Sequence, residues 1–392
     1  MDFYAHHCGI PSVSVNISRF RGPSGVDEYH LVVTPTKYGS VNAQLEWVAH
    51  AYHKTLESIG LDARTAVLRR FFCSDLHNQA EALDACPISR CGNADDPCAI
   101  SRVGQPPGPP AKVILWAYHV RDRGNELEKS LRGAHLTLRR GDLSHHWTTG
   151  LTCTTGHGSY GQTRGIFDRY NALLCEQGMT LADHVMRTWL FVRDIDANYQ
   201  GLVAARREFF AEHGLTADTH FIASSGIGGS SADPAAIVTL DAYAISGVRP
   251  EQIRFLAAPD HLSPTYVYGV TFERGTSVAY RDRKHVIISG TASIDHQGKI
   301  LYPGDVSRQL DRTLENIEAL LDHAGATVND MSAFIVYIRD PSDHMIAQQQ
   351  MRDRFGHAPI AVLVAPVCRP GWLIEVEGTA VVPETNPELL PF

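Results

Sequence analysis

Residues 309–340 read QLDRTLENIEALLDHAGATVNDMSAFIVYIRD, and this stretch decides the fold. Its first half carries apolar side chains at the spacing of an amphipathic helix: Leu310, Leu314, Ile317 and Leu321. Gly325 stands where such a helix is expected to end. A run of β-branched and aromatic residues then continues up to Asp340, which predicts a buried strand.

The same pattern occurs twice more along the chain. One copy begins at Gln44 and its strand ends at Asp75, while the other begins at Gln162 and its strand ends at Asp194. Further strands frame each copy, and a second helix follows each aspartate. This order describes an α+β unit with both helices on one face of its sheet. The expected fold class is therefore α+β, with three tandem units.

Two polar joints separate the units, Arg121-DRGNELEKSLRG and Gly247-VRPEQ. We expect boundaries near residues 125 and 250, which give modules of 1–125, 126–250 and 251–392. The length of 392 residues fits two to four domains.

Composition narrows the function classes. The net charge of −8 disfavours a general nucleic-acid surface, and an anionic substrate would need a local arginine cluster. No apolar run is long enough to cross a membrane, and the N-terminal residues lack the apolar core of a secretory signal, so we expect a cytoplasmic protein. The spacing of Cys86, Cys91 and Cys98 fits no usual zinc pattern and indicates reduced thiols, with metal binding as a minor alternative. We expect no metal and no cofactor.

Four segments of the third unit carry a resemblance: Ile288-SGTASI, the helix with Gln309 and Leu314-Glu315-Asn316, Tyr337-IRDPSD and Leu373-IEVEGTAV. The unit resembles the RidA/YjgF family over its whole length, and the other two units match more loosely. Members of that family assemble as trimers with ligand clefts between subunits. The resemblance thus implies an intrachain pseudo-trimer, which could be monomeric or form a homo-oligomer.

A larger resemblance covers about the last two-thirds of the chain. Tyr268-GVTFERG, Ile288-SGTASI and Pro366-VCRPGWLIEVEG resemble the chorismatases, elaborated RidA-like enzymes that release pyruvate from chorismate. Glu375 matches the catalytic glutamate of that family. Cys368 stands where a cysteine marks the chorismatases that form 3-hydroxybenzoate. Plain RidA deaminases carry an arginine before this turn, and His357-APIAVLVAPV has none, which argues against imine hydrolysis.

An acid pair, Glu375 and Glu377, lies on one face of a predicted strand because side chains alternate along a strand. The corresponding stretch of unit two has Thr239 and Asp241, so the pair is confined to one repeat. A carboxyl group in a partly apolar cleft has a raised pKa and can donate a proton near neutral pH. We therefore expect Glu375 to be the general acid, and Glu377 to be either a ligand contact or part of a solvated face.

The remaining candidates are predicted substrate contacts. Arg274 and Arg369 could each pair a carboxylate of a dianionic substrate, and Tyr268 could donate a hydrogen bond beside Arg274. Cys368 would shape the surroundings of the ring rather than act as a nucleophile. Gly290 and Ala292 would let a ring approach the backbone, although Gly290 could instead mark a β-bulge.

Other motifs favour no separate chemistry. Ser225-GIGGSS resembles a phosphate cradle but lacks the lysine of a P-loop, so we expect it to border a cleft at most. The charged run Arg281–Lys284 is typical of a solvated hairpin turn. Two alternatives to a chorismatase stay open: a RidA-like imine or enamine deaminase, and a non-catalytic small-molecule binding module.

Overall fold

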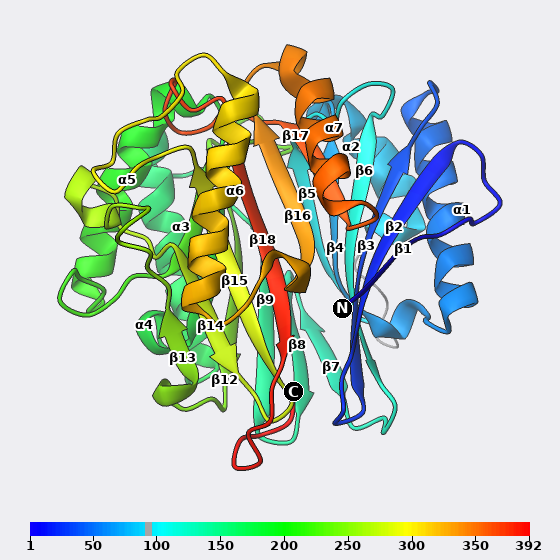
Figure 1. Cartoon of the computed structure of the whole chain (residues 1–392), viewed down its shortest axis with the longest axis horizontal. Coiled ribbons are helices and arrows are strands. Elements are labelled where there is room, and N and C mark those ends of the chain that lie inside the picture. Colours follow the sequence, from blue (N-terminus) through cyan, green and yellow to red (C-terminus); the bar gives the residue numbers. More distant parts are fainter. Residues whose placement is uncertain (91–95) are drawn as a thin grey trace.

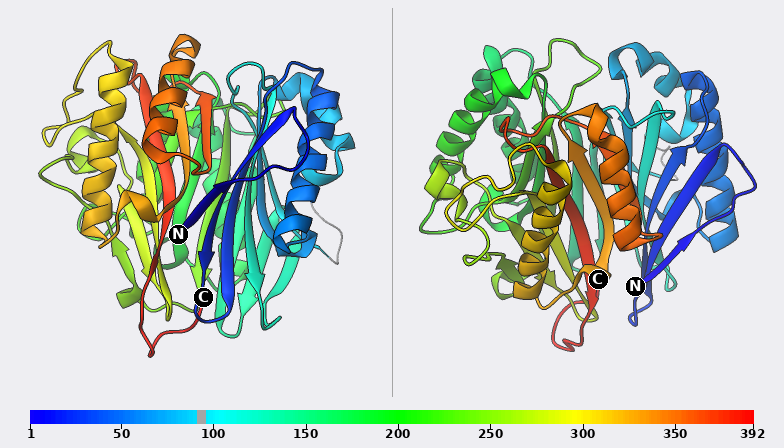
Figure 2. Two further views of the ribbon diagram at one scale, coloured as in Figure 1. Left: turned by 45° about the vertical axis from the view of Figure 1, so that its right-hand side comes forward. Right: turned by 45° about the horizontal axis from the view of Figure 1, so that its top comes forward.

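The structure, a computed structural model, describes residues 1–90 and 96–392, except the side chain of Tyr268. Within these residues, eighteen strands form three six-stranded sheets, and seven α-helices accompany them. The sheets lie in the middle of the molecule and the helices cover the outside (Figures 1 and 2). The predicted α+β class with three tandem modules is confirmed. Cys91 lies outside the described residues.

The first sheet has the strand order β1-β2-β3-β6-β4-β5. Its elements are β1 Asp2–Ala5, β2 Val13–Arg21, β3 Val26–Pro35, α1 Val41–Ile59, β4 Ala66–Cys73, α2 Leu76–Ala85, β5 Ala99–Gly104 and β6 Val113–Asp122.

The second sheet has the order β11-β10-β12-β9-β8-β7. Its elements are β7 Glu128–Arg132, β8 His135–Arg140, β9 Leu143–Leu151, α3 Gly158–Glu176, α4 Leu181–His184, β10 Val185–Val192, α5 Ile195–Glu212, β11 Ala223–Gly228 and β12 Val238–Ser246.

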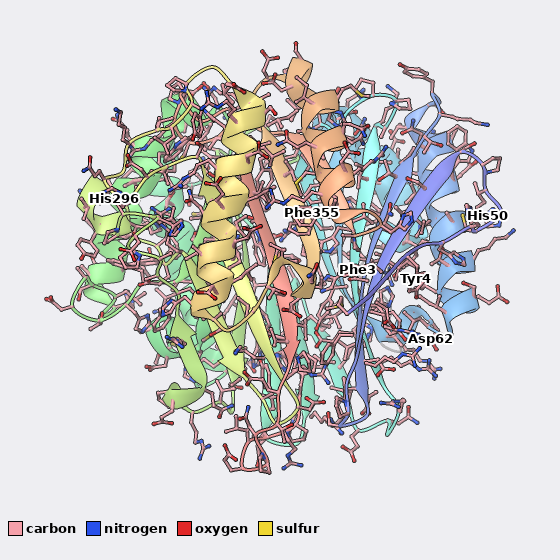
Figure 3. All side chains as sticks on the ribbon, in the orientation of Figure 1. Phe3, Tyr4, His50, Asp62, His296 and Phe355 are labelled. Atoms are coloured by element: carbon pink, nitrogen blue, oxygen red, sulfur yellow. The ribbon has the colours of Figure 1, made fainter. Side chains whose placement is uncertain are left out.

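The third sheet has the order β13-β14-β15-β18-β16-β17. Its elements are β13 Ile253–Phe255, β14 Gly275–Ala279, β15 Arg283–Ala292, α6 Val306–His323, β16 Met331–Ile338, α7 His344–Phe355, β17 Ile360–Val364 and β18 Ile374–Pro383. The helices of this module pack on their sheet through apolar side chains. Phe355 at the end of α7 is labelled in Figure 3, and its ring lies 4.4 Å from that of Phe334 on β16.

One buried glutamine fixes the same turn in every module. Each amide donates to a carbonyl and accepts from an N–H just before the closing strand, at 2.7 to 3.0 Å: Gln44 to Pro110 and Lys112, Gln162 to Ala235 and Ile237, and Gln309 to Gly371 and Leu373. Counting four residues onward from the bonded carbonyl gives the equivalent positions Ile114, Thr239 and Glu375. The sequence repeat is therefore a structural repeat with a defined register.

Two sequence-based expectations need correction. The first joint is not all loop, because Glu128–Arg132 forms β7 at the edge of the second sheet. The run Arg281–Lys284 is solvated only in part, because Arg281 is exposed whereas Asp282 and Arg283 are buried. Arg283 is fully buried and donates to Glu28 at 2.6 Å and to the adjacent Asp282, so its charge is neutralised by a residue from another module. That partner stands 255 positions earlier, which no local pattern reveals.

The module boundaries near residues 125 and 250 stay a prediction. The last strand of one sheet and the first strand of the next are separated by short segments at these two places. No helix among the described residues combines the length and apolar character needed to cross a bilayer.

Candidate active site

A cavity lies between the second and third modules. Strand β11 of the second module forms one wall, and backbone hydrogen bonds join both ends of this strand to segments of the third module. The N–H of Glu273 donates to the carbonyl of Ile222 at 3.1 Å, and the N–H of Gly228 donates to the carbonyl of Pro366 at 2.9 Å. The cavity measures about 480 Å³, including the open space at its mouth. We call it the second–third cleft.

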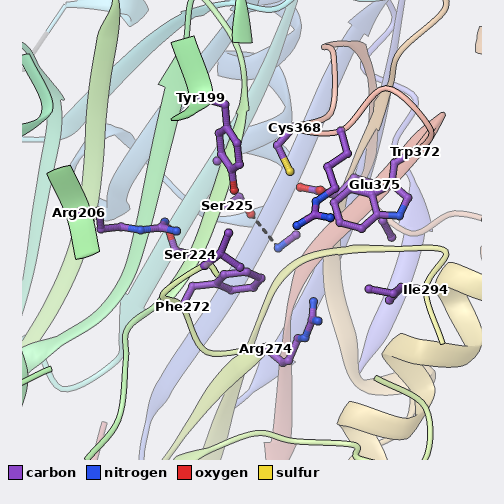
Figure 4. A pocket seen from close by; sticks show the side chains of 15 residues that line it. Tyr199, Arg206, Ser224, Ser225, Phe272, Arg274, Ile294, Cys368, Trp372 and Glu375 are labelled. Atoms are coloured by element: carbon purple, nitrogen blue, oxygen red, sulfur yellow. Dashed lines mark hydrogen bonds between the residues drawn. The ribbon is translucent and has the colours of Figure 1, made fainter. Parts of the chain in front are cut away.

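The second–third cleft gathers residues from distant parts of the chain (Figure 4). Six of the predicted site residues line it: Arg274, Gly290, Ala292, Cys368, Arg369 and Glu375. Glu377 does not line it, and the side chain of Tyr268 lies outside the described residues. The other lining residues are Tyr199, Arg206, Ser224, Ser225, Gly226, Val270, Phe272, Ile294 and Trp372.

Glu375 is the acidic residue of this lining. It sits near the start of β18, its side chain is buried, and Trp372 lies beside it (Figure 4). Burial raises the pKa of Glu375 to about 8, and the negative charge of Glu377 adds to this effect, against the opposing charges of Arg187 and Arg274. The carboxyl group is therefore largely protonated at neutral pH, as a general acid must be.

Gly290 makes room for that carboxyl. A β-carbon at this position would lie 2.0 Å from Oε1 of Glu375, so a larger residue would displace the carboxyl from this place. The register of β15 against β18 shifts between Ile288 and Thr291, which places Gly290 in a β-bulge. The bulge interpretation of Gly290 therefore holds. The N–H of Gly290 donates to Oγ of Ser225 at 2.8 Å and ties the bulge to the facing module.

Glu377 lies behind the cleft wall rather than on a solvated face. Its side chain accepts hydrogen bonds from Nη2 of Arg187 and Nε1 of Trp189, both at 2.7 Å, and from the hydroxyl of Ser225. All of these donors belong to the second module. Glu377 and Arg187 form a buried ion pair, with side chains 3% and 1% exposed. Glu377 thus joins the two modules and places a fixed negative charge near Glu375.

Cys368 and Tyr199 face each other across the cleft (Figure 4) and are hydrogen-bonded through their side chains. Burial raises the pKa of the Cys368 thiol to about 12, and the nearby Glu375 contributes in the same direction. Because the thiolate is the nucleophilic form, a thiol with this pKa is a poor nucleophile. The role of Cys368 as a residue that shapes the site without covalent chemistry stays a prediction.

Three arginines line the cleft and form the local cluster that an anionic substrate would need. Arg206 and Arg274 are buried, and Arg369 is partly exposed. Arg274 donates to the carbonyl of Ser263 at 3.0 Å and lies over the ring of Phe272, while the guanidinium of Arg369 lies over the ring of Trp372. A dianionic ligand would meet an arginine on more than one wall.

Three lining residues that no sequence motif singled out come from the second module: Tyr199, Arg206 and Ser224. The motif that begins at Ser225 forms the second half of β11 as far as Gly228, and its first two residues, Ser225 and Gly226, border the cleft as expected. A signal for Arg206 existed in the repeat. Arg206 stands twelve positions after Asp194, and Arg352 stands twelve positions after Asp340.

Residues 275–382 match the family model described as endoribonuclease L-PSP. A RutC family protein of Pyrococcus abyssi is 31% identical over 106 residues, which are 26% of this chain and 84% of the relative. This chain belongs to the RutC family. The RidA/YjgF resemblance seen in the third unit is thereby confirmed.

One further relative and one solved structure cover more of this RutC family chain. The 3-hydroxybenzoate synthase of Streptomyces hygroscopicus is 28% identical over 241 residues, which are 55% of this chain and 68% of the relative. A crystal structure of a chorismatase superposes with a TM-score of 0.60 and covers 81% of this chain and 93% of its own, at 18% identity. The chain therefore has the fold of that chorismatase, as its sequence resemblance implied.

Proposed function

We propose that the chain is a chorismatase that releases pyruvate from chorismate and forms a hydroxybenzoate, most directly 3-hydroxybenzoate. The observation that carries the proposal is the buried Glu375, whose pKa burial raises, in a cleft with three arginines. Chorismate is a dianion with an acid-labile enolpyruvyl ether, so its cleavage calls for this pairing of a proton donor with cations. The relative that is a 3-hydroxybenzoate synthase, and the shared fold with a chorismatase, support the choice of substrate.

The reaction begins with proton transfer. Glu375 donates its proton to the methylene carbon of the enolpyruvyl group, which becomes a methyl group and leaves an oxocarbenium-like centre. The carboxylate of Glu375 then stabilises that positive charge. Water or the ring hydroxyl adds to the centre, the ether linkage breaks, and pyruvate departs. If water adds, the ring keeps both of its oxygens and then loses one water to become aromatic. If the ring hydroxyl adds, pyruvate leaves with one ring oxygen and the ring loses only a proton, which returns to Glu375. On either route pyruvate and hydroxybenzoate together account for all atoms of chorismate.

The experiment that tests this proposal is incubation of the purified chain with chorismate, followed by mass spectrometry and a lactate dehydrogenase assay for pyruvate. We expect pyruvate and 3-hydroxybenzoate in equal amounts. Folded protein that yields neither would overturn the proposal. Release of ammonia from amino-acid-derived imines would instead favour the deaminase, although the segment from His357 to Val367 lacks the arginine of that class.

The pH dependence of the reaction should follow the acid form of Glu375. The pKa of this carboxyl is raised to about 8, so the acid form dominates below that pH and is lost above it. We expect kcat/KM to fall about tenfold per pH unit on the alkaline side, with a midpoint near pH 8. Stopped assays of pyruvate release between pH 6 and pH 10 measure this limb. An alkaline limb that is unchanged in Glu375→Asp and lies far above pH 8 would assign it to another group.

The role of Cys368 can be separated from that of Glu375. Because its thiol is neutral, we expect Cys368→Ala to retain pyruvate release within about tenfold of the wild-type rate. The product should change, since the thiol contacts Tyr199 where the ring would lie, and a smaller side chain admits water. Liquid chromatography with mass spectrometry should show a lower share of 3-hydroxybenzoate and more dihydroxycyclohexadiene carboxylate. Cys153→Ala, on the second module outside the cleft, is the matched control. Loss of all pyruvate release in Cys368→Ala alone would assign the thiol a direct chemical role.

A further inference from the structure

A second cavity lies between the third and first modules, on the opposite side of the third module from the second–third cleft. It measures about 850 Å³, including its open mouth. Helix α7 and strand β17 form one wall and strands β2 and β3 form the other, and Figures 1 and 2 show α7 close to the first sheet. We call it the third–first cleft. The third module contributes to this cleft as the second module does to the second–third cleft, and the first module takes the place of the third.

The repeat register makes the equivalence explicit. Ile114 stands at the position of Glu375, four residues after the glutamine-bonded carbonyl. Gly108 stands at the position of Arg369, two residues before that carbonyl. All four residues line their respective clefts. The third–first cleft is thus the same architectural site with its proton donor replaced by an aliphatic side chain.

The outer strands give the same correspondence. On the closing strands, Ala117 and Gly378 each stand seven positions after the glutamine-bonded carbonyl, and they pair with Leu31 and Ile288. Leu31 and Ile288 pair in turn with Ile17 and Gly275 on the next strand of the sheet. Asn16 therefore takes the place of Arg274. A strong cation of the second–third cleft becomes a neutral hydrogen-bonding amide.

One arginine survives in the third–first cleft. Arg352 on α7 stands twelve positions after Asp340, as Arg206 on α5 stands twelve after Asp194. Arg352 lines the cavity and forms no ion pair with any residue that the structure describes. No aspartate or glutamate is among the described residues of the lining. Arg352 is solvent-exposed, unlike the buried Arg206, so it places a positive charge at the mouth of the cleft that no carboxylate of the described lining compensates.

His344 closes the inner end of this cleft. The residue is 6% exposed and is hydrogen-bonded to the backbone of Val362. Its imidazole lies directly on Gly108, where a β-carbon would come within 2.1 Å of the ring. Burial lowers the pKa of His344 against the hydrogen bond to Val362, and the charge of Arg352, which lines the same cleft, acts in the same direction as burial. Arg352 and a polar ring therefore face the same space.

We propose that the third–first cleft binds a small monocarboxylate, with Arg352 as the carboxylate anchor and Asn16 as a hydrogen-bond donor to its polar groups. One arginine matches one carboxylate, whereas the second–third cleft presents three. The cleft is a binding site without catalysis, because Ile114 offers no proton. The proposal stands independently of the reaction assigned to the other cleft.

Two isoleucine methyl groups report on this cleft directly. Ile114 and Ile360 line it, while Ile294 lines the second–third cleft. We would label the δ1 methyl groups of isoleucine with ¹³C in the full chain, assign Ile114 with the Ile114→Val variant, and titrate with pyruvate or with 3-hydroxybenzoate. The aliphatic and aromatic probes distinguish which monocarboxylate the cleft prefers. We expect saturable shifts of the Ile114 and Ile360 signals with at least one probe.

The deciding variant is Arg352→Gln. Loss of a charge-assisted arginine–carboxylate contact should weaken binding at the Ile114 and Ile360 signals by roughly tenfold or more. Arg354→Gln is the matched control, because Arg354 lies on the same helix but pairs with Glu318 outside the cleft. Any pyruvate-releasing activity should persist in both variants. Absence of shifts at Ile114 and Ile360 with either probe, or equal affinities in the two variants, would overturn the proposal.

Discussion

Replacing Glu375 by glutamine is expected to lower the rate of pyruvate release from chorismate by roughly 10²- to 10⁴-fold, the usual contribution of a positioned general acid. Glutamine has nearly the same shape but carries no transferable proton. The loss should appear in kcat, since the arginines that hold the substrate are unchanged. Single-turnover measurement of pyruvate by coupled assay would separate this step from binding.

Stability measurements serve as the control for this variant. A buried carboxyl whose pKa is raised in the folded state costs stability above its unfolded pKa, because it must be protonated on folding. This loss of stability in the wild type grows as pH rises towards 8. The Tm of Glu375→Gln should therefore equal or exceed the wild-type Tm, and the difference between the two Tm values should increase between pH 5 and pH 8. Glu384→Gln, beyond the end of the same strand, makes the same chemical change outside the cleft and should leave activity intact. An active Glu375→Gln enzyme would refute the proposed acid.

Much of this fold could be predicted because each repeat shows local patterns of apolar and glycine residues that indicate its helices and strands. The amphipathic spacing of α6 and the glycine that follows it predict a helix and its end, and the β-branched run predicts β16. The helices that start near Gln44, Gln162 and Gln309 follow in the same way. The glutamines themselves were markers of the repeat in the sequence, and their reason, the paired amide bonds to the closing turn, appears only in three dimensions.

The site was predictable on one wall alone. Glu375, Cys368 and Arg369 lie within eight consecutive residues, so a sequence motif can contain them. Arg206 and Tyr199 reach the same cavity from the second module, more than 150 residues away, and no local pattern links them. Glu377 shows the opposite limit. Alternation correctly places it on the face of Glu375, but its engagement by Arg187 and Trp189 depends on how the modules pack.

That packing gives the other large expected effect. Glu377→Gln removes the charge that pairs with the buried Arg187 and leaves the guanidinium without its counter-ion, which should lower the free energy of unfolding by about 3 to 5 kcal/mol. It also removes the like charge that raises the pKa of Glu375. The alkaline limb of kcat/KM should therefore move to lower pH. Urea unfolding and a pH–rate profile measure the two effects.

The chain supplies a matched control for both. Asp241 occupies the position of Glu377 in the second module and pairs with the buried Arg70 at 2.8 Å, with a hydroxyl of Ser101 where Glu377 has that of Ser225. Asp241→Asn should destabilise the fold by a similar amount, because it breaks an equally buried ion pair between modules. It should not move the pH limb, since Thr239 stands there in place of an acid. Equal pH shifts in the two variants would mean that the limb reflects loosened packing, whereas a shift confined to Glu377→Gln would show that one ion pair both joins the modules and tunes the acid.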